Sequence, residues 1–494
     1  MRRSSSSARA VTGRDASGWA VLACALALAW VAPDARAQSE RQRFERTLEQ
    51  MRTETLDRIA PGSTADQRVI FDYGAYAIFD YLSVDDNRNE NHVLRQYSLV
   101  PYVRLNLDNV HEVLVRGRLT YRDFNDGDSF DNRGDELVDP DVDRAYYKFD
   151  LARSAAAYNG TTLPYNFTLL AGRDFAYWGN GLVLGTTLDG VAVGVSVGAL
   201  SLGVVAGITP VRTVDFDASR PAFDYNTRRG FYGAIATLTA GTHRPFVYGL
   251  AQRDYNTQDR LDLGNVVTEY HYDSWYLGFG STGSFTDRLT YGVEAVYEGG
   301  RGNSNSFVID PPFLTPVDQT RDSIGSWAAD FRLDYLFTDV RKSRVGVEFL
   351  VASGDSDRLH TSNTFGGNLS GTTDRSFNGF GLVNTGLAFA PDISNVMMFR
   401  VGASTFPLPE YSSTRLLQVG ADLFVFGKTD RDGAFSETTS DSRYLGWEPD
   451  VYLNWQVTSD MSLALRYGVF FPSSDTFPDD TARQFFSLTL TFSL

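Results

Sequence analysis

The chain has 494 residues, of which 43% are hydrophobic and 21% charged, with 34 Phe, 25 Tyr, 7 Trp and a single Cys. So many aromatic residues exclude a disordered chain, and one Cys excludes a disulfide framework and Cys-based zinc sites. The formal charge of −16 argues against a nucleic-acid partner. The mean hydropathy of −0.24, taken alone, would also argue against a membrane protein.

Residues 1–37 have the pattern of a secretory signal peptide. A basic start is followed by an apolar stretch over residues 19–32, and then by Ala35 and Ala37 ahead of a cleavage site before Gln38. A lipoprotein signal that used Cys24 would leave a much shorter apolar stretch, so we favour the ordinary signal peptide. Cleavage removes five Arg and two Asp, which changes the net charge from −16 to −19 and leaves no Cys.

Residues 38–66 form a separate N-terminal segment with the pattern of a short helix. Phe44, Leu48, Met51 and Ile59 lie roughly on one helical face, and the Pro-Gly pair at 61–62 ends the pattern. We expect a periplasmic helix that packs on the next domain. A plug or docking element is the alternative.

From residue 67 to residue 494 the sequence alternates with a period of two, which predicts β-strands with one apolar and one polar face. In the first segment Val69, Phe71 and Tyr73 share one face, whereas Asp72 and Asp80 lie on the other. The domain contains nineteen such segments: 68–82, 92–107, 112–122, 144–151, 165–175, 189–198, 200–209, 231–240, 244–254, 274–284, 288–298, 327–337, 344–352, 384–390, 395–404, 415–426, 447–457, 461–471 and 484–494.

Segments of about 9–12 residues match a tilted strand that crosses a bilayer. Short connections alternate with long polar ones: 108–109, 284–287, 338–343, 391–394 and 458–460 are short, and 124–143, 210–229, 300–325, 353–383 and 427–445 are long. This asymmetry predicts an all-β fold, an antiparallel transmembrane β-barrel of the bacterial outer membrane with short periplasmic turns and long extracellular loops.

The number of strands follows from the same pattern. Bacterial single-chain barrels have an even number of strands, so one of the nineteen segments is spurious or one is missed. We expect 18 strands, with 16 and 20 as alternatives. The order of short and long connections breaks between Pro391 and Gly446, which places the error there.

Residues 190–211 form an uncharged run that could suggest a transmembrane helix, but the alternation favours a hairpin. Bulky residues such as Val193 and Val204 share the lipid face, and small residues such as Gly194 and Gly203 face inward. A loop folded into the lumen would fit against this small wall. The last strand alternates in the same way up to Leu494 and resembles the signal that barrel-assembly machinery reads.

The inward polar faces carry the candidate pore residues. Arginine supplies a planar fork that matches carboxylates, and a ring of Arg gives a pore anion selectivity. Only three of the 45 basic residues are Lys, so the other 42 are Arg. Pairing with luminal acids such as Glu112, Asp150 and Asp174 is the alternative role for these basic residues. The strand faces place in the lumen Arg104, Arg116, Arg118, Arg122, Arg144, Lys148 and Arg173.

Nothing in the sequence has the spacing of a metal site, and nothing points to a catalytic or cofactor site. The loop 123–143 holds nine acids but does not match an EF-hand. We expect a solvated loop there, with a weak divalent-cation site as the alternative. His92, His111, His243, His271 and His360 form no metal-spaced pair.

Two patches carry short motifs of glycine, aromatic and charged residues. The first runs through Gly172-Arg173-Asp174, then residues 177–182, then Asp189-Gly190-Val191. The second comprises residues 446–450 and Arg466 with the residues up to Pro472. Both patches resemble the alginate-export family of outer-membrane porins, which usually has Gln at the position of Asp174. The resemblance implies a monomeric porin with an Arg-lined pore for an anionic polysaccharide, and it carries Arg173 and Arg466 over as pore residues.

The sequence therefore predicts an outer-membrane channel that passes an alginate-like anionic polysaccharide or another anionic solute passively, without catalysis or cofactor. One alternative is a general or solute-specific porin for small molecules, and another is an outer-membrane hydrolase or surface-binding barrel. The expected partners are the polysaccharide or solute, outer-membrane lipid and lipopolysaccharide, and the barrel-assembly machinery. No nucleic acid is expected, and the barrel is expected to be a monomer.

Overall fold

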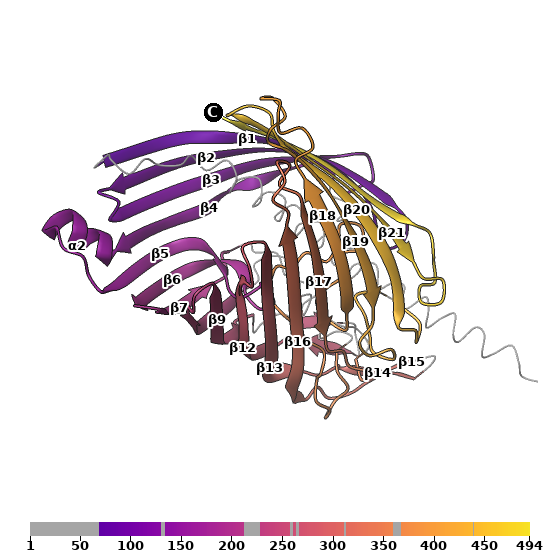
Figure 1. Ribbon diagram of the computed structural model, residues 1–494. Coiled ribbons are helices and arrows are strands. Elements are labelled where there is room, and N and C mark those ends of the chain that lie inside the picture. Colours follow the sequence, from indigo (N-terminus) through magenta and orange to yellow (C-terminus); the bar gives the residue numbers. More distant parts are fainter. Residues whose placement is uncertain are drawn as a thin grey trace, which may run out of the picture.

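A computed structural model describes residues 69–129, 134–211, 228–256, 260–262, 266–310, 313–358, 367–437 and 439–494. The predicted signal peptide (1–37) and N-terminal segment (38–66) lie outside the described residues, as does His360. The described chain is almost entirely β-structure (Figure 1). Within it, no helix is both long enough and apolar enough to span a membrane.

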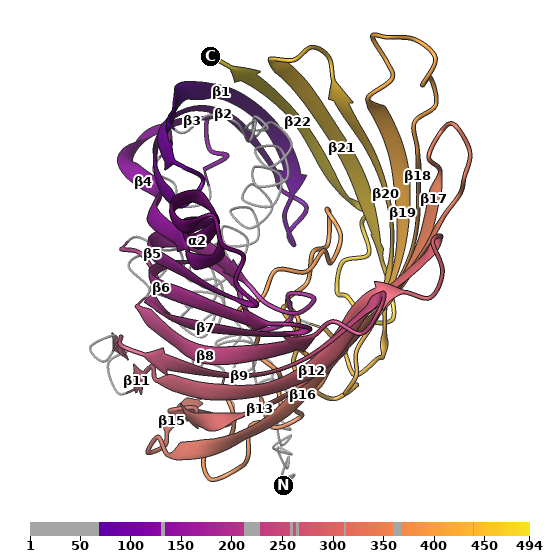
Figure 2. The ribbon, with the colours of Figure 1, turned by 60° about the vertical axis from the view of Figure 1, so that its left-hand side comes forward.

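Eighteen antiparallel strands form one closed sheet, because the first strand pairs with both the second and the last. Figure 2 shows the strands curving around the lumen. In chain order they are β1 (Val69–Asp85), β2 (Asn91–Leu107), β3 (His111–Phe124), β4 (Glu136–Asp150), β5 (Tyr165–Tyr177), β6 (Gly185–Val197), β7 (Leu200–Ile208), β8 (Arg229–Leu238), β9 (His243–Asp254), β12 (Tyr272–Ser284), β13 (Leu289–Asn303), β16 (Arg321–Leu336), β17 (Arg344–Ala352), β18 (Met397–Thr405), β19 (Leu417–Gly427), β20 (Tyr444–Gln456), β21 (Met461–Pro472) and β22 (Arg483–Ser493).

The connections differ at the two ends of the barrel. At the short-turn end they are mostly tight, as at Asp108 and Asn109, whose φ values of 55° and 57° confirm the predicted turn. One of them contains the helix α2 (Leu151–Asn159). The long-loop end carries two small hairpins, β10 (Arg260–Asp262) with β11 (Val267–Glu269) and β14 (Phe307–Asp310) with β15 (Phe313–Pro316).

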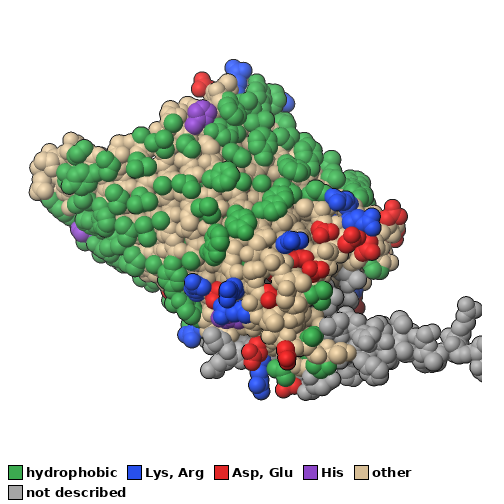
Figure 3. Space-filling model, turned by 90° about the horizontal axis from the view of Figure 1, so that it is seen from below, with side chains coloured by type: hydrophobic (Ala, Val, Ile, Leu, Met, Phe, Trp, Pro, Cys, Tyr) green, Lys and Arg blue, Asp and Glu red, His purple; other side chains and the backbone are tan. Residues whose placement is uncertain are grey.

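The strand faces follow the predicted alternation. In the hairpin of β6 and β7, Val193 pairs with Val204 on the outer face, and Gly194 pairs with Gly203 on the inner face. Figure 3 shows the broad band of hydrophobic side chains that results on the outside of the barrel, with most of the charged side chains in that view beyond one border of the band. Such a band is the surface that contacts lipid in outer-membrane barrels.

One predicted strand is wrong. Residues 384–390 are not a strand, although their alternation resembles one, and removing them turns the nineteen segments into 18. The error therefore lies just before Pro391 rather than after it. Residues 391–394 are likewise no turn between strands but part of the long connection from β17 to β18. Apolar side chains alternate here because the segment packs inside the barrel, where Ala388 and Phe389 are buried.

We predict that an added charge destabilises the barrel on the outer face of β7 but not on its inner face. Val204 is exposed on the outer face near the middle of the strand, where Arg costs about 2–4 kcal/mol of folding free energy in a bilayer. Val204→Arg should therefore unfold at lower urea concentration from lipid vesicles. Ser201→Arg, on the inner face of the same strand, is the matched control and should unfold as the wild type does. Equal losses for both variants would contradict the assignment of faces.

Candidate functional site

A basic wall covers the inner face of three neighbouring strands. Cross-strand pairing places Arg116 opposite Arg144 and Lys148 opposite Glu112, and directly paired residues point to the same face of a sheet. The opposite face of these strands carries exposed apolar residues such as Val115. Six of the predicted pore residues thus come together in the lumen: Arg104, Arg116, Arg118, Arg122, Arg144 and Lys148.

A β-bulge organises the centre of this basic wall. The register of β3 with β4 shifts between Arg116 and Gly117, which inserts Asp143 as an extra residue on β4. The Asp143 carboxylate lies 2.8 Å from Nη2 of Arg116 and 3.1 Å from Nη2 of Arg118. One carboxylate is therefore shared between two guanidinium groups.

Three other arginines of the wall are paired one to one, as the alternative in the sequence predicts. Arg104 lies 3.3 Å from Glu112, Arg122 lies 2.8 Å from Glu136, and Arg144 lies 3.5 Å from Asp174. Asp150, by contrast, accepts a hydrogen bond from the backbone N–H of Arg153 and caps helix α2. Two acids of the predicted loop 123–143 are thus part of the wall, since Glu136 and Asp143 belong to β4 and pair with its arginines.

Arg173 does not point into the lumen with the others. Its neighbour Asp174 faces Arg144, and successive residues of a strand point to opposite faces. Arg173 donates to both carboxylate oxygens of Asp189, at 2.6 and 2.9 Å, and also reaches Asp141 of β4. Backbone pairing of β4 with β5 ends at Ala145 and Arg173, so Arg173 ties the two strands together where their ladder stops.

A second charged surface lines the lumen on the far side of the barrel. Glu348 of β17 lies between two guanidinium groups, 2.8 Å from Arg332 and 2.7 Å from Arg400. Arg332 also lies 2.8 Å from Asp330, and Arg400 lies 3.0 Å from Asp422. This ladder crosses four neighbouring strands, from β16 to β19.

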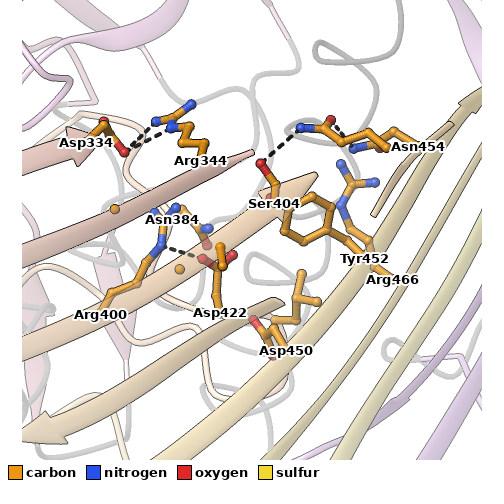
Figure 4. A pocket seen from close by; sticks show the side chains of 15 residues that line it. Asp334, Arg344, Asn384, Arg400, Ser404, Asp422, Asp450, Tyr452, Asn454 and Arg466 are labelled. Carbon is orange, nitrogen blue, oxygen red and sulfur yellow. Dashed lines mark hydrogen bonds and ion pairs between the residues drawn. The ribbon is translucent and has the colours of Figure 1, made fainter. Parts of the chain in front are cut away.

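A cavity of about 240 Å³ lies beside this ladder, near the strand ends at the short-turn end. Figure 4 shows the side chains that line it. Arg466, the residue carried over from the second patch, lines the cavity together with Asp450 and Tyr452 of β20. The lining combines three acids, three Arg and several uncharged polar groups, which suits hydrogen bonding to a polar solute. Its charged and polar members are Asp334, Arg344, Asn384, Arg400, Ser404, Gln418, Asp422, Asp450, Tyr452, Asn454 and Arg466.

A second cavity, of about 350 Å³, lies against the small inner wall of β6 and β7. Gly190, Gly194 and Gly203 line it, and so do Lys148 and Asp174 from the basic side. A loop folded into the lumen is present, as expected. Its backbone pairs with residues 181–185, which lead into β6, rather than with this wall. The small residues therefore border open space.

Two segments fold into the lumen and pair with each other. Phe380 donates its backbone N–H to Val183 O and accepts from Gly185 N, at 3.1 and 2.9 Å, and Leu382 N donates to Gly181 O at 2.8 Å. We call residues 178–184 and 377–389 the inner loops. In Figure 2 part of the connection from β17 to β18 is visible inside the ring of strands.

Three buried glutamates of the barrel wall bind the backbone of the inner loops. Glu448 accepts hydrogen bonds from the N–H groups of Leu387, Ala388 and Phe389, at 2.5, 2.7 and 2.8 Å. Its side chain is fully buried. Carboxylates are strong acceptors for backbone N–H groups, so Glu448 fixes this turn of the inner loop against β20.

Glu294 and Glu298 of β13 act in the same way. Glu294 accepts from Asn180 N at 2.5 Å, and Glu298 accepts from Asn378 N at 2.9 Å. Each also accepts a hydrogen bond from a tyrosine hydroxyl: Tyr248 donates to Glu294, and Tyr276 donates to Glu298. Both glutamates are completely buried.

Glycine permits the closest of these approaches. Gly179 has φ of 59° and Gly386 has φ of 98°, which disfavour other residues. A Cβ on Gly179 would come within 2.4 Å of Oε1 of Glu294, and one on Gly386 within 2.8 Å of Oε1 of Glu448. The Trp-Gly-Asn-Gly turn of the first patch is therefore explained by its docking on Glu294.

A hydrophobic core inside the barrel completes the attachment of the inner loops. Phe389 stacks on Phe470 of β21, with ring centroids 4.0 Å apart and nearly parallel planes, and Phe380 packs edge-on against Phe231 of β8 at 5.2 Å. All four side chains are buried. The lumen is thereby narrowed by packed polypeptide.

Sequence reasoning missed the anchoring glutamates and the ladder of Arg332, Glu348 and Arg400. The alternation of β13 could have revealed the anchors, because Glu294 and Glu298 share a face opposite the exposed Val293 and Tyr297. What the sequence does not show is which loop each carboxylate binds.

One group of described residues brings metal-binding atoms together. Ligand atoms of Asp86, Glu90 and His92 lie within 4.8 Å of one another. Asp86 already accepts hydrogen bonds from the N–H groups of Arg88 and Glu90, and His92 Nδ1 lies 2.6 Å from the carbonyl of Asp128. These contacts give the group a role in closing the connection from β1 to β2.

Comparison with known proteins shows the family of the chain. The sequence model of the Alginate export family matches residues 207–483, which is more than half of the chain. The chain belongs to the alginate export family. The match includes the three anchoring glutamates, the ladder and Arg466, whereas the basic wall of β2 to β4 precedes it. A search of curated proteins gives no match.

Solved structures share the fold. Pseudomonas aeruginosa OccK11 (OpdR) is 13% identical with a TM-score of 0.51, and the alignment covers 86% of this chain and 96% of that one. The outer membrane protein opdK of the same organism is 11% identical with a TM-score of 0.50 over 86% and 99% of the two chains. Together, the family and the closed 18-stranded barrel make this protein a channel of the bacterial outer membrane.

We predict that Glu448→Ala releases the inner loop formed by residues 377–389. The change leaves three backbone N–H groups without their acceptor, and each unsatisfied buried group costs about 1–3 kcal/mol. The loop should leave the wall, and the single-channel conductance in planar bilayers should rise. Glu410→Ala, which removes an exposed carboxylate at the short-turn end, is the control. A conductance unchanged from the wild type would show that Glu448 does not hold the constriction.

Proposed function

We propose that this channel passes an anionic, uronate-type polysaccharide across the outer membrane, by diffusion and without a covalent step. The observation that carries the proposal is the basic wall, in which six cationic side chains on three adjacent strands face the lumen. Five of them, the arginines, share four carboxylates as ion-pair partners. The alginate export family of the chain supports the same substrate class.

The ion pairs of the basic wall suit a passing polyanion. A carboxylate of the polymer can take the place of Glu112 at Arg104, whose side chain keeps 27% of its surface exposed, or can compete with Asp143 for Arg116 and Arg118. Because each guanidinium exchanges one carboxylate for another, the polymer is bound weakly at each point and can move to the next. The pore residues we propose are Arg104, Arg116, Arg118, Arg122, Arg144, Lys148 and Arg466.

The charge-balanced cavity supports a second candidate function, a channel for small polar solutes. Arg400 with Asp422 and Arg344 with Asp334 form close pairs across its lining, which would favour a small neutral or dipolar molecule over a long polyanion. Block of the conductance by an oligouronate but not by a neutral sugar would decide for the polysaccharide.

The orientation and the flanking segments complete the proposal. The long-loop end would face the exterior and the short-turn end the periplasm, as in barrels of this kind. Residues 1–37 would direct export and be removed, and residues 38–66 would lie on the periplasmic side as a packed helix or a plug. Assembly machinery would insert the barrel as a monomer.

We predict that Arg104→Gln combined with Arg118→Gln lowers the preference for anions, because two of the six cations facing the lumen are lost. The reversal potential in a KCl gradient measures this preference, and the concentration of oligouronate needed to block the current should rise. Arg173→Gln is the matched control, since Arg173 lies on the other face of its strand, and should leave both quantities unchanged. A wild-type channel that prefers cations would contradict the proposal.

A further inference from the structure

The outer surface carries a cluster of arginines at the long-loop end of four neighbouring strands. Asp273 of β12 lies at the centre, 3.5 Å from Arg253 of β9 and 2.5 Å from Arg321 of β16. Arg301 of β13 is paired directly with Asp273 across the ladder, and His271 lies 3.1 Å from the same carboxylate. We call these five residues the outer arginine cluster.

The cluster points away from the lumen. Asp273 lies on the same face of β12 as Trp275 and Leu277, which are exposed on the outer surface. Arg301 shares its face of β13 with the exposed Tyr297. Arg253 and Arg321 keep 57% and 45% of their side-chain surfaces exposed. These groups therefore do not line the lumen.

The charges of the cluster do not cancel. The cluster holds three guanidinium groups and a single carboxylate, that of Asp273, whose side chain is only 14% exposed. Arg253 reaches that carboxylate at 3.5 Å, and more than half of its side-chain surface stays exposed. Guanidinium groups bind phosphate oxygens in pairs, so this cluster has the composition of a site for a phosphorylated ligand.

The position of the cluster indicates which ligand. Outward aromatic residues lie below it on three of the same strands, namely Trp275, Tyr297 and Trp327. Such residues mark the level of the membrane interface in barrels. Asp273 is two residues from Trp275, and Arg301 is four from Tyr297, which at about 3.3 Å per residue places the charges just beyond the hydrocarbon. Figure 3 shows charged side chains gathered beyond one border of the hydrophobic band.

We propose that the outer arginine cluster binds the phosphate groups of an outer-leaflet glycolipid. In this arrangement the acyl chains lie along the apolar face of β12, β13 and β16, the sugar rests at the aromatic level, and a phosphate bridges Arg253, Arg301 and Arg321. Basic clusters beside a membrane surface recognise anionic headgroups in this way. The site is independent of the transported solute and depends only on the long-loop end facing the exterior.

The test titrates the full mature protein, in a non-ionic detergent, with bisphosphorylated lipid A and records binding by native mass spectrometry. The double variant Arg253→Gln with Arg321→Gln should bind at least about tenfold more weakly, because charge-assisted hydrogen bonds to phosphate are lost. Arg153→Gln is the matched control, an exposed arginine with one carboxylate partner at the opposite end of the barrel, and should bind as the wild type does.

A second measurement keeps the test independent of the folding of the variant. Wild-type protein should bind lipid A from which the phosphates have been removed at least about tenfold more weakly than the intact lipid. Equal binding of the two lipids, or wild-type affinity in a correctly folded double variant, would overturn the proposal. Inorganic phosphate that binds as tightly as lipid A would also overturn it, because the cluster would then take a free anion.

Discussion

The structure of the lumen depends on one kind of interaction, the hydrogen bond from the backbone of an inner loop to a buried carboxylate of the wall. A loop that enters a barrel leaves the ladders that satisfy its N–H groups, and a buried group without a partner is costly. Glu294, Glu298 and Glu448 supply the missing acceptors at three points of the wall. Aromatic packing then adds area, as between Phe389 and Phe470. Because the anchors sit on β13 and β20, the barrel itself sets the position of the constriction.

The anchored loops also divide the work of the lumen. Their apolar side chains pack on one side of the lumen, on strands from β8 to β21, and the ladder of Arg332, Glu348 and Arg400 lines part of the same side with internally paired groups. The opposite side, formed by β2 to β4, keeps the basic wall, whose carboxylates are 13% to 29% exposed, against 0% to 8% for those of the ladder. Lys148 and Asp174 connect this wall to the cavity beside β6 and β7. Charge that faces the passage is therefore concentrated away from the anchors. The acidic composition of the whole chain hides this local excess of Arg.

Alternation with a period of two was sufficient to predict the barrel and its number of strands. It also placed six of the eight candidate pore residues on the inward face of their strands. It failed where side chains alternate for another reason, as at residues 384–390, which pack inside the barrel instead of crossing the membrane. It also failed at Arg173, which was placed by the strand face and by the resemblance to a short motif, although Asp174 and not Arg173 faces Arg144. A loop folded into the lumen was expected, but the contacts of the inner loops could not be predicted, because the pairing of Phe380 with Val183 joins segments almost 200 residues apart. The docking of Gly179 on Glu294 depends on the same tertiary arrangement.

The central claim is that the lumen, narrowed by fixed inner loops, still passes a carboxylated polymer. The most direct measurement is efflux of defined oligosaccharides from liposomes that contain the purified mature protein. The account predicts that an oligouronate leaves faster than a neutral oligosaccharide of the same length, and that high salt removes the difference by screening the basic wall. An oligouronate that leaves at the same rate as the neutral chain, or more slowly, would contradict the account.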